Sequence, residues 1–186
     1  MYKRQVPAGV WNDVNGEYIN AHGGGILLFD SKYYWFGEHR PAKGFSTEVG
    51  VTCYSSTDLC NWRYEGVALS VSEEAGNEIE KGCIMERPKV IYNKRTKKFV
   101  MWFHLELKGK GYEAARAGVA VSDSPTGPYC FVSSSRVCPG IFPLNMTEEE
   151  RDIQWNMEQF EEWWTPEWRE AVNKGLFVKR DLEGGQ

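Results

Sequence analysis

The sequence contains no apolar run long enough to cross a membrane and no cluster of basic residues. A membrane-spanning helix needs about 20 consecutive apolar residues, and nucleic-acid recognition needs a positively charged surface. Here 22 Lys and Arg stand against 26 Asp and Glu, which gives a formal net charge of −4. The sequence therefore predicts neither a membrane protein nor a nucleic-acid-binding protein.

Cysteine is also sparse, and its spacing excludes the usual cysteine-based sites. The five residues stand at positions 53, 60, 83, 130 and 138, an odd number without a CxxC pair. Such a set indicates neither a zinc site nor a complete disulfide framework, so we expect buried free thiols. The chain also lacks a nucleophilic triad, a dinucleotide fingerprint and metal-ligand spacing. No cofactor and no metal site are predicted.

The first residues of the sequence show no recognisable targeting signal. Residues 1–5 (MYKRQ) are charged but are not followed by the apolar segment of a signal peptide. This pentapeptide resembles read-through at the ends of gene fragments, so we expect residues 1–7 to be non-native or disordered. The localisation of the protein is therefore not predicted from the sequence itself.

What the chain does have is a repeated strand pattern. Residues 25–38 and residues 90–104 each read as strand, tight turn and strand, and each is followed by a further strand that begins near a Gly-Val pair. Trp35 and Trp102 are 67 positions apart in this pattern. A repeat of four short strands is typical of a β-propeller blade. We predict an all-β fold, with blade one at about 25–69 and blade two at about 83–133.

The pattern changes after the second blade. Residues 146–175 are acidic, rich in Trp and helical in character, with a possible capping box at residues 147–150. Thr165 and Pro166 fit an N-cap followed by proline at the first helical position, and Gly175 fits the C-terminal end. We interpret this segment as a helical insertion between blades.

The first strands of the two predicted blades carry candidate functional residues, because these strands line the central channel of a propeller. His22 stands in the entry to the first blade, before three consecutive glycines, and Glu86 stands in the entry to the second. A carboxylate there can accept hydrogen bonds from sugar hydroxyls or act as an acid or base. The alternatives are an ion pair of Glu86 with Arg87 or Lys89 and a purely structural role for His22.

Glu38 and His104 end the second strands of the two predicted blades. If the repeat is a propeller, polar groups at these strand ends face one channel and form a cluster with the entry strands. Carboxylates, histidines and aromatic side chains around a channel suit carbohydrate chemistry. The high aromatic content of 14% fits sugar stacking, although Trp also serves simply to fill the interfaces between sheets.

Five ordered motifs resemble glycoside hydrolase family 43, nearest to the branch that contains exo-β-1,3-galactanases. They lie at residues 21–26, 33–38, 53–62, 86–93 and 118–128. The resemblance implies a five-bladed β-propeller that hydrolyses glycosidic bonds of an oligo- or polysaccharide with inversion. Many members are secreted or periplasmic, and some hold a calcium ion, for which no residues can be identified here.

The resemblance also implies roles for particular residues. His22 occupies the place where most members carry the base Asp, which the galactanase-like branch also lacks. Glu86 matches a substrate-contacting Glu, so substrate contact is favoured over catalysis for this residue. Glu38, Trp102, His104 and Tyr112 are the other expected substrate-binding residues, with Trp102 or Tyr112 as a stacking face.

The resemblance places the general acid on a later blade that residues 8–186 do not include. At roughly 65 residues per blade, five blades need about 300 residues. We therefore interpret residues 8–186 as an incomplete propeller glycosidase domain that is inactive alone. Two alternatives stay open: a non-catalytic carbohydrate-binding propeller and an interaction propeller without a sugar site.

Overall fold

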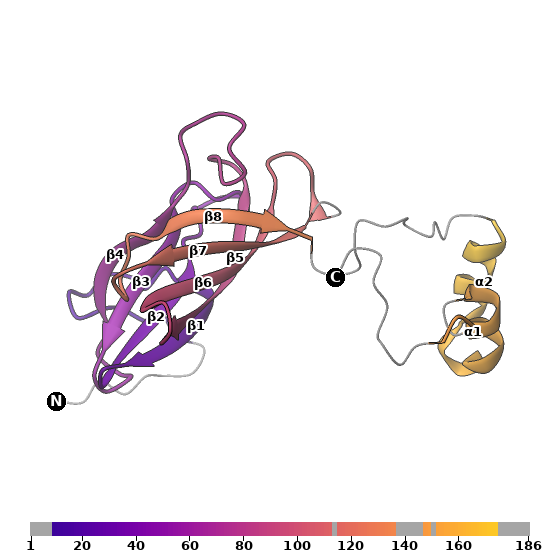
Figure 1. Ribbon diagram of the computed structural model, residues 1–186, viewed down its shortest axis with the longest axis horizontal. Coiled ribbons are helices and arrows are strands. Elements are labelled where there is room, and N and C mark those ends of the chain that lie inside the picture. The colour runs from indigo at the N-terminus through magenta and orange to yellow at the C-terminus, as the bar shows by residue number, and fades with distance from the viewer. Residues whose placement is uncertain (1–8, 113–114, 137–146, 150–151, 175–186) are drawn as a thin grey trace. The chain divides into compact units, whose positions relative to one another are not determined.

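The structure is a computed structural model that describes residues 9–112, 115–136, 147–149 and 152–174. The chain forms two compact units, Met1–Ser135 and Arg136–Gln186. The first unit consists of two four-stranded antiparallel sheets (Figure 1). The expected all-β fold is confirmed for this unit.

Each sheet is a meander in which consecutive strands are neighbours. The first sheet has the order β1-β2-β3-β4, with strands β1 (His22–Phe29), β2 (Lys32–Glu38), β3 (Gly50–Ser56) and β4 (Arg63–Ser70). The second has the order β5-β6-β7-β8, with strands β5 (Ile84–Asn93), β6 (Lys98–Glu106), β7 (Arg116–Ser122) and β8 (Cys130–Ser135). This is the strand order of propeller blades.

The turn between β1 and β2 explains why this hairpin closes in two residues. Asp30 and Ser31 have φ values of 49° and 59°, so both central residues adopt the left-handed conformation. Two such residues form the type of turn whose twist matches that of antiparallel strands. Because the turn fixes the register, Phe29 pairs with Lys32 and the strands run in step up to Gly25 opposite Phe36.

The main hydrophobic core lies between the two sheets. In β6, every second side chain is buried, and these four residues face the first sheet: Phe99, Met101, Phe103 and Leu105. The first sheet contributes Tyr34, Phe36, Val51, Cys53 and Leu69 to the same core. The inner strands of the two sheets, β1 and β5, also pack against each other. In β6 the alternation of period two therefore decides which side chains face this core.

The other face of the first sheet has a smaller core of its own. Trp62 is 2% exposed there, and its ring lies edge-on to Trp35 with centroids 5.2 Å apart. The segment before β1 covers this face, because Trp11 packs against Trp35 and Ile19 belongs to the same cluster. The aromatic residues of this sheet thus fill its interfaces.

The strand register corrects the repeat spacing inferred from the sequence. Phe36 pairs with Gly25 and Cys53, and the residue in the same position of the second sheet is Trp102, which pairs with Lys89 and Val119. The offset is therefore 66 (102 − 36), and the pairing of Trp35 with Trp102 was wrong by one. A shift of one residue turns a side chain to the opposite face of the sheet.

The second unit is helical, with α1 (Ile153–Gln159), the short 3-10 helix η3 (Glu161–Trp163) and α2 (Pro166–Asn173). Thr165 is the N-cap of α2 and Pro166 its first residue, as expected. The helix α1 begins later than the predicted capping box, since Asp152 Oδ1 accepts the backbone N–H groups of Gln154 and Trp155. Gly175 lies outside the described residues. None of the helices in the described ranges is long and apolar enough to span a membrane.

The cysteines follow the expectation in part. Cys53 and Cys83 are buried free thiols, and burial raises the pKa of each to about 12. Cys130, however, is exposed, and Cys60 is only half-buried, so the expectation of burial was wrong for these two. Cys130 pairs with Val121 and therefore lies on the face of the second sheet that points away from the main core. Cys138 is outside the described residues.

Candidate functional site

The two inner strands are distorted at corresponding points. The ladder of β1 is irregular between His22 and Gly25, and that of β5 is irregular between Glu86 and Lys89. Within these bulges Gly23 and Arg87 have φ values of 56° and 52°. A left-handed arginine is strained, and such strain is found disproportionately at functional sites. The bulges make His22 and Glu86 equivalent positions of the two blades.

Within each sheet, one of these two residues pairs with another predicted site residue on the second strand. His22 is the ladder partner of Glu38, and Glu86 is the ladder partner of His104. Each blade therefore carries one His and one Glu at the same end of its first two strands, in opposite order. Because β1 packs against β5, the sequence-predicted strand ends of the two blades are brought near each other.

Arg40 joins the two carboxylates into one group. Its Nε lies 3.1 Å from Glu38 Oε2, and its Nη2 lies 3.5 Å from Glu86 Oε1. Arg87 adds a second cation, with Nη2 3.4 Å from Glu86 Oε2. The Glu86 side chain is 19% exposed and that of Glu38 is 2% exposed. We call Glu38, Arg40 and Glu86 the carboxylate–arginine cluster.

Asn20 holds the backbone of Arg40 in place. Its side-chain amide donates to the carbonyl oxygen of Arg40 and accepts from the N–H of Arg40, both at 2.8 Å. The backbone of Asn20 is itself fixed, because its carbonyl accepts from Thr52 Oγ1 at 2.6 Å and its N–H donates to the Tyr54 hydroxyl at 3.1 Å. Arg40 thus projects from a backbone anchored to the first sheet.

Glu38 is the most buried member of the cluster, and within the part of the chain that the structure describes only one of its two carboxylate oxygens accepts a hydrogen bond. Oε2 accepts from Arg40, whereas Oε1 is buried and has no hydrogen-bond partner among the described residues. Burial raises the pKa of Glu38, the neighbouring Glu86 raises it further, and Arg40 opposes both effects. A buried unpaired acceptor is costly. Oε1 has spare capacity to accept a hydrogen bond, and a ligand hydroxyl reaches it only if the side chains that cover it move aside.

His22 stays neutral at neutral pH. Burial and then the positive charge of Arg40 and the neighbouring His39 lower the pKa of His22 from its ordinary value of 6.5. Its Nε2 lies 3.1 Å from the Tyr18 hydroxyl. This side chain can exchange hydrogen bonds as an uncharged group, which suits both the substrate-contacting role and the structural one.

His104 belongs to a second small group. Its Nε2 lies 3.0 Å from Glu106 Oε1, and its ring lies 5.5 Å from the ring of Tyr112 at an angle of 34°. Tyr112 is 54% exposed. The structure thus places the predicted substrate-binding residues His104 and Tyr112 together, and His104 is the cross-strand partner of Glu86.

Trp102 is the counterpart of Phe36 in the second sheet. It faces away from the main core, is 48% exposed and corresponds to Phe36 of the first sheet. Phe36 is completely buried between the two sheets. The stacking role of Trp102 stays a prediction.

Replacing Arg40 tests the electrostatics of the cluster. Because Arg40 lowers the pKa of Glu38 against the effect of burial, Arg40→Gln is expected to raise that pKa further. Arg87→Gln is the matched control: Arg87 acts in the same direction but more weakly, so its removal should raise the pKa less. A pH titration of the Glu38 carboxyl carbon by NMR measures both shifts. Equal shifts in the two variants, or none, would contradict this assignment.

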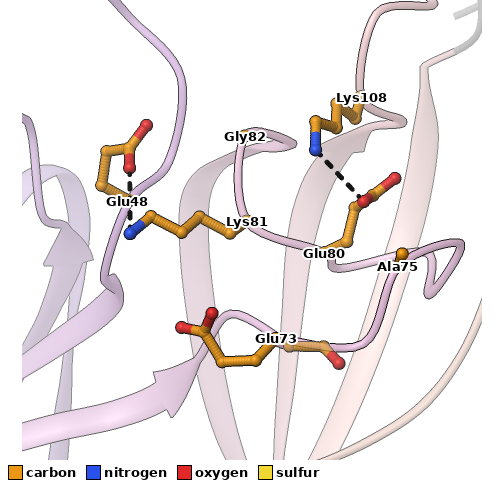
Figure 2. Close-up of a pocket in the computed structure, with 8 residues that line it drawn as sticks. Glu48, Glu73, Ala75, Glu80, Lys81, Gly82 and Lys108 are labelled. Carbon is orange, nitrogen blue, oxygen red and sulfur yellow. Dashed lines mark hydrogen bonds and ion pairs between the residues drawn. The ribbon is translucent and has the colours of Figure 1, made fainter.

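A separate polar pocket lies beside the connection between the two sheets (Figure 2). Its volume is about 430 Å³, and it is lined by Glu48, Ser72, Glu73, Ala75, Glu80, Lys81, Gly82 and Lys108. Four of its charges form two ion pairs, Lys81 with Glu48 at 3.5 Å and Lys108 with Glu80 at 3.2 Å. Because these charges neutralise each other, the pocket is a weaker candidate than the carboxylate–arginine cluster.

Within the described part of the chain, no group of three or more His, Cys, Asp or Glu side chains is arranged to hold a metal ion. The residues that sequence reasoning missed are Arg40, Asn20 as its anchor, and Glu106. A usable signal for Arg40 was its place two residues after Glu38 at the end of a strand, where alternate side chains share a face. Glu106 likewise follows His104 by two residues.

Solved structures of sugar-cleaving enzymes match this chain. A GH43 β-1,3-galactosidase, solved with galactodeoxynojirimycin, is 69% identical with a TM-score of 0.79, and the match covers 96% of this chain and 52% of that one. The exo-β-1,3-galactanase from Phanerochaete chrysosporium, solved with β-1,3-galactotriose, is 42% identical with a TM-score of 0.62, over 68% of this chain and 28% of that one. The exo-β-1,3-galactanase from Clostridium thermocellum is 43% identical with a TM-score of 0.61, over 69% and 27%.

Among curated proteins, the raffinose invertase of Escherichia coli is 30% identical over 77 residues, which are 41% of this chain and 14% of that protein. No protein-family profile matches the chain. The chain spans about half the length of the β-1,3-galactosidase and less than a third of the length of the two galactanases. Its sequence identity to that enzyme and its two propeller-type sheets place the chain in glycoside hydrolase family 43, near the branch of β-1,3-galactosidases and exo-β-1,3-galactanases.

Proposed function

We propose that this chain supplies the sugar-binding part of the active site of a glycosidase that hydrolyses β-1,3-linked galactosides. The observation that carries the proposal is the 69% identity to a β-1,3-galactosidase over 96% of the chain. The carboxylate–arginine cluster supports it, because hydroxyl-rich ligands need buried, preorganised acceptors and donors. The substrate would be an oligo- or polysaccharide that ends in galactose.

In this proposal Glu38 and Glu86 bind hydroxyls of the terminal galactose. The unpaired Oε1 of Glu38 accepts one hydroxyl hydrogen, and Glu86, which already contacts two arginines, accepts another. Arg40 holds both carboxylates in place and balances their charge. Neutral His22 fills the position at which most members of the family carry the base, and the His104–Tyr112 pair borders the sugar next to Glu86.

Hydrolysis with inversion needs two carboxyl groups far enough apart to admit a water molecule, one as acid and one as base. Glu38 and Glu86 are joined through one guanidinium, which suits two groups that bind the same sugar ring better than two groups on opposite sides of a glycosidic bond. We therefore propose that the general acid comes from sequence beyond these 186 residues, and that these residues alone do not hydrolyse galactosides.

A chimera tests this function in the presence of the remaining blades. In it, the present chain replaces the matching half of the β-1,3-galactosidase. The chimera is expected to hydrolyse β-1,3-galactotriose with kcat/KM within about tenfold of the parent enzyme, while the chain alone releases no galactose. A folded chimera that neither hydrolyses galactotriose nor binds galactodeoxynojirimycin would refute the proposal. Binding without hydrolysis would favour the alternative, a non-catalytic carbohydrate-binding propeller.

A further inference from the structure

The loop that follows β2 is held at both of its ends. At one end Asn20 clamps the backbone of Arg40. At the other, Thr47 is fully buried, donates its N–H to the carbonyl of Cys83 at 2.7 Å and accepts the N–H of Met85 on its side-chain oxygen at 2.9 Å. Residues 40–47 therefore run between two fixed points, one on each sheet.

This anchored loop presents an aromatic ring to solvent beside the cluster. Phe45 is 69% exposed, and its ring centroid lies 5.4 Å from Arg40 Cζ, a cation–π distance. The edge of the same guanidinium contacts Glu38 and Glu86. Single exposed apolar residues are common. This one, however, lies at cation–π distance from the cation that joins the two proposed sugar-binding carboxylates.

The exposures of these residues separate an inner part of the proposed site from an outer part. Glu38 is 2% exposed and Glu86 is 19% exposed, whereas Phe45 is mostly in solvent. A galactose held by the two carboxylates would occupy the inner part, so the next sugar of the chain would lie nearer to the ring of Phe45. The C–H groups of a galactopyranose give it one apolar face, which can pack on an aromatic ring.

We propose that Phe45 forms an outer subsite, in which its ring stacks on the second galactose of a β-1,3-linked chain. The inference rests on the proposed function, because it takes the carboxylate–arginine cluster as the site of the terminal sugar. Phe45 then contributes affinity for oligosaccharides and adds little to the binding of a single sugar.

The test compares a trisaccharide with a monosaccharide analogue in the chimera. Phe45→Ala is expected to raise KM for β-1,3-galactotriose about 5- to 10-fold, with kcat and the inhibition constant of galactodeoxynojirimycin unchanged. Phe45→Trp should restore the KM, and Phe45→Leu, which keeps apolar surface but no ring, should restore it only in part. Lys43→Ala, an exposed change in the same loop, is the control and should alter neither constant.

Three results would overturn the inference. An unchanged KM in Phe45→Ala would exclude the stacking contact, and an equal rise of KM and of the inhibition constant would mean that Phe45 acts through Arg40 on the inner sugar. A lower Tm with unchanged KM would mean that Phe45 packs against protein. All three presuppose an active unmodified chimera. A folded but inactive chimera that does not bind the inhibitor would instead refute the proposed function, and this inference with it.

Discussion

Glu86→Gln in the chimera is expected to lower kcat/KM for β-1,3-galactotriose by about 100-fold, since a hydrogen bond to a charged group is worth about 1.5–3 kcal/mol. Glu86 is only 19% exposed and lies between Arg40 and Arg87, at 3.5 and 3.4 Å. The glutamine amide lacks the negative charge that both arginines face. It also places an NH₂ donor where the carboxylate of Glu86 would accept a hydrogen bond from a sugar hydroxyl. Steady-state kinetics on galactotriose measure the loss.

Glu80→Gln is a suitable control for this experiment. Glu80 is another carboxylate of similar exposure, 21%, that pairs with a single lysine, Lys108, in the separate polar pocket (Figure 2). Its substitution is expected to change kcat/KM less than twofold. Near-normal turnover by a folded Glu86→Gln chimera would sink the proposed role of Glu86, and an equal loss in both variants would indicate a general effect on folding.

Gly37→Ala is expected to destabilise the chain by about 3 kcal/mol, at the upper end of the cost of overpacking a core. A Cβ at this position would lie 2.2 Å from the carbonyl carbon of Ala21 and 2.3 Å from its oxygen. These are backbone atoms of the segment that covers the first sheet, so they cannot move aside as a flexible side chain can. Ala21 directly follows Asn20, and the substitution should therefore also disturb the anchor of Arg40.

Gly25→Ala provides a graded comparison, because its Cβ would first meet the side-chain Cδ of Lys89, at 2.8 Å. The lysine side chain can shift, so the loss should be smaller, although the carbonyl oxygen of Pro88 lies only 3.0 Å away. Urea unfolding curves of the two variants and the parent chain give the difference. A Gly37→Ala variant as stable as Gly25→Ala would contradict the close approach of Ala21 to β2.

Much of the fold could be predicted from the sequence because strands such as β6 alternate in burial and the hairpins have recognisable turn residues, although β3 is buried at every position. The alignment of the two four-stranded repeats with each other was predicted less well. The matching tryptophans suggested a spacing of 67, whereas the ladders give 66 for the second and third strands. The bulges near His22 and Glu86 are alike in the two sheets and leave the offset unchanged. The β1–β2 turn has two residues (30–31) and the β5–β6 turn has four (94–97), so the offset rises from 64 (86 − 22) in the first strands to 66 (102 − 36) in the second. One position decides which face Trp102 occupies.

The two carboxylates of the candidate site could be predicted from the sequence, but the contact of one arginine with both of them could not. Glu38 and Glu86 stand out at strand ends, and the spacing from Glu38 points to Arg40, but the contact of Arg40 with Glu86 of the other sheet cannot be read from the sequence. The position of Arg40 depends on Asn20 and Thr47, which contact residues far from them in the chain. Such contacts between distant segments depend on how the two sheets pack, which a single sequence does not specify.

The most direct test of the central claim is the NMR signal of the Glu38 side-chain carboxyl carbon in the chimera during a titration with galactodeoxynojirimycin. If the carboxylate–arginine cluster binds the terminal galactose, this signal will shift in a saturable way with the same midpoint as inhibition. The shift will be much weaker with the glucose-configured analogue, which differs at one hydroxyl. An unchanged Glu38 signal at inhibitor concentrations that stop hydrolysis would contradict the claim and place the sugar elsewhere.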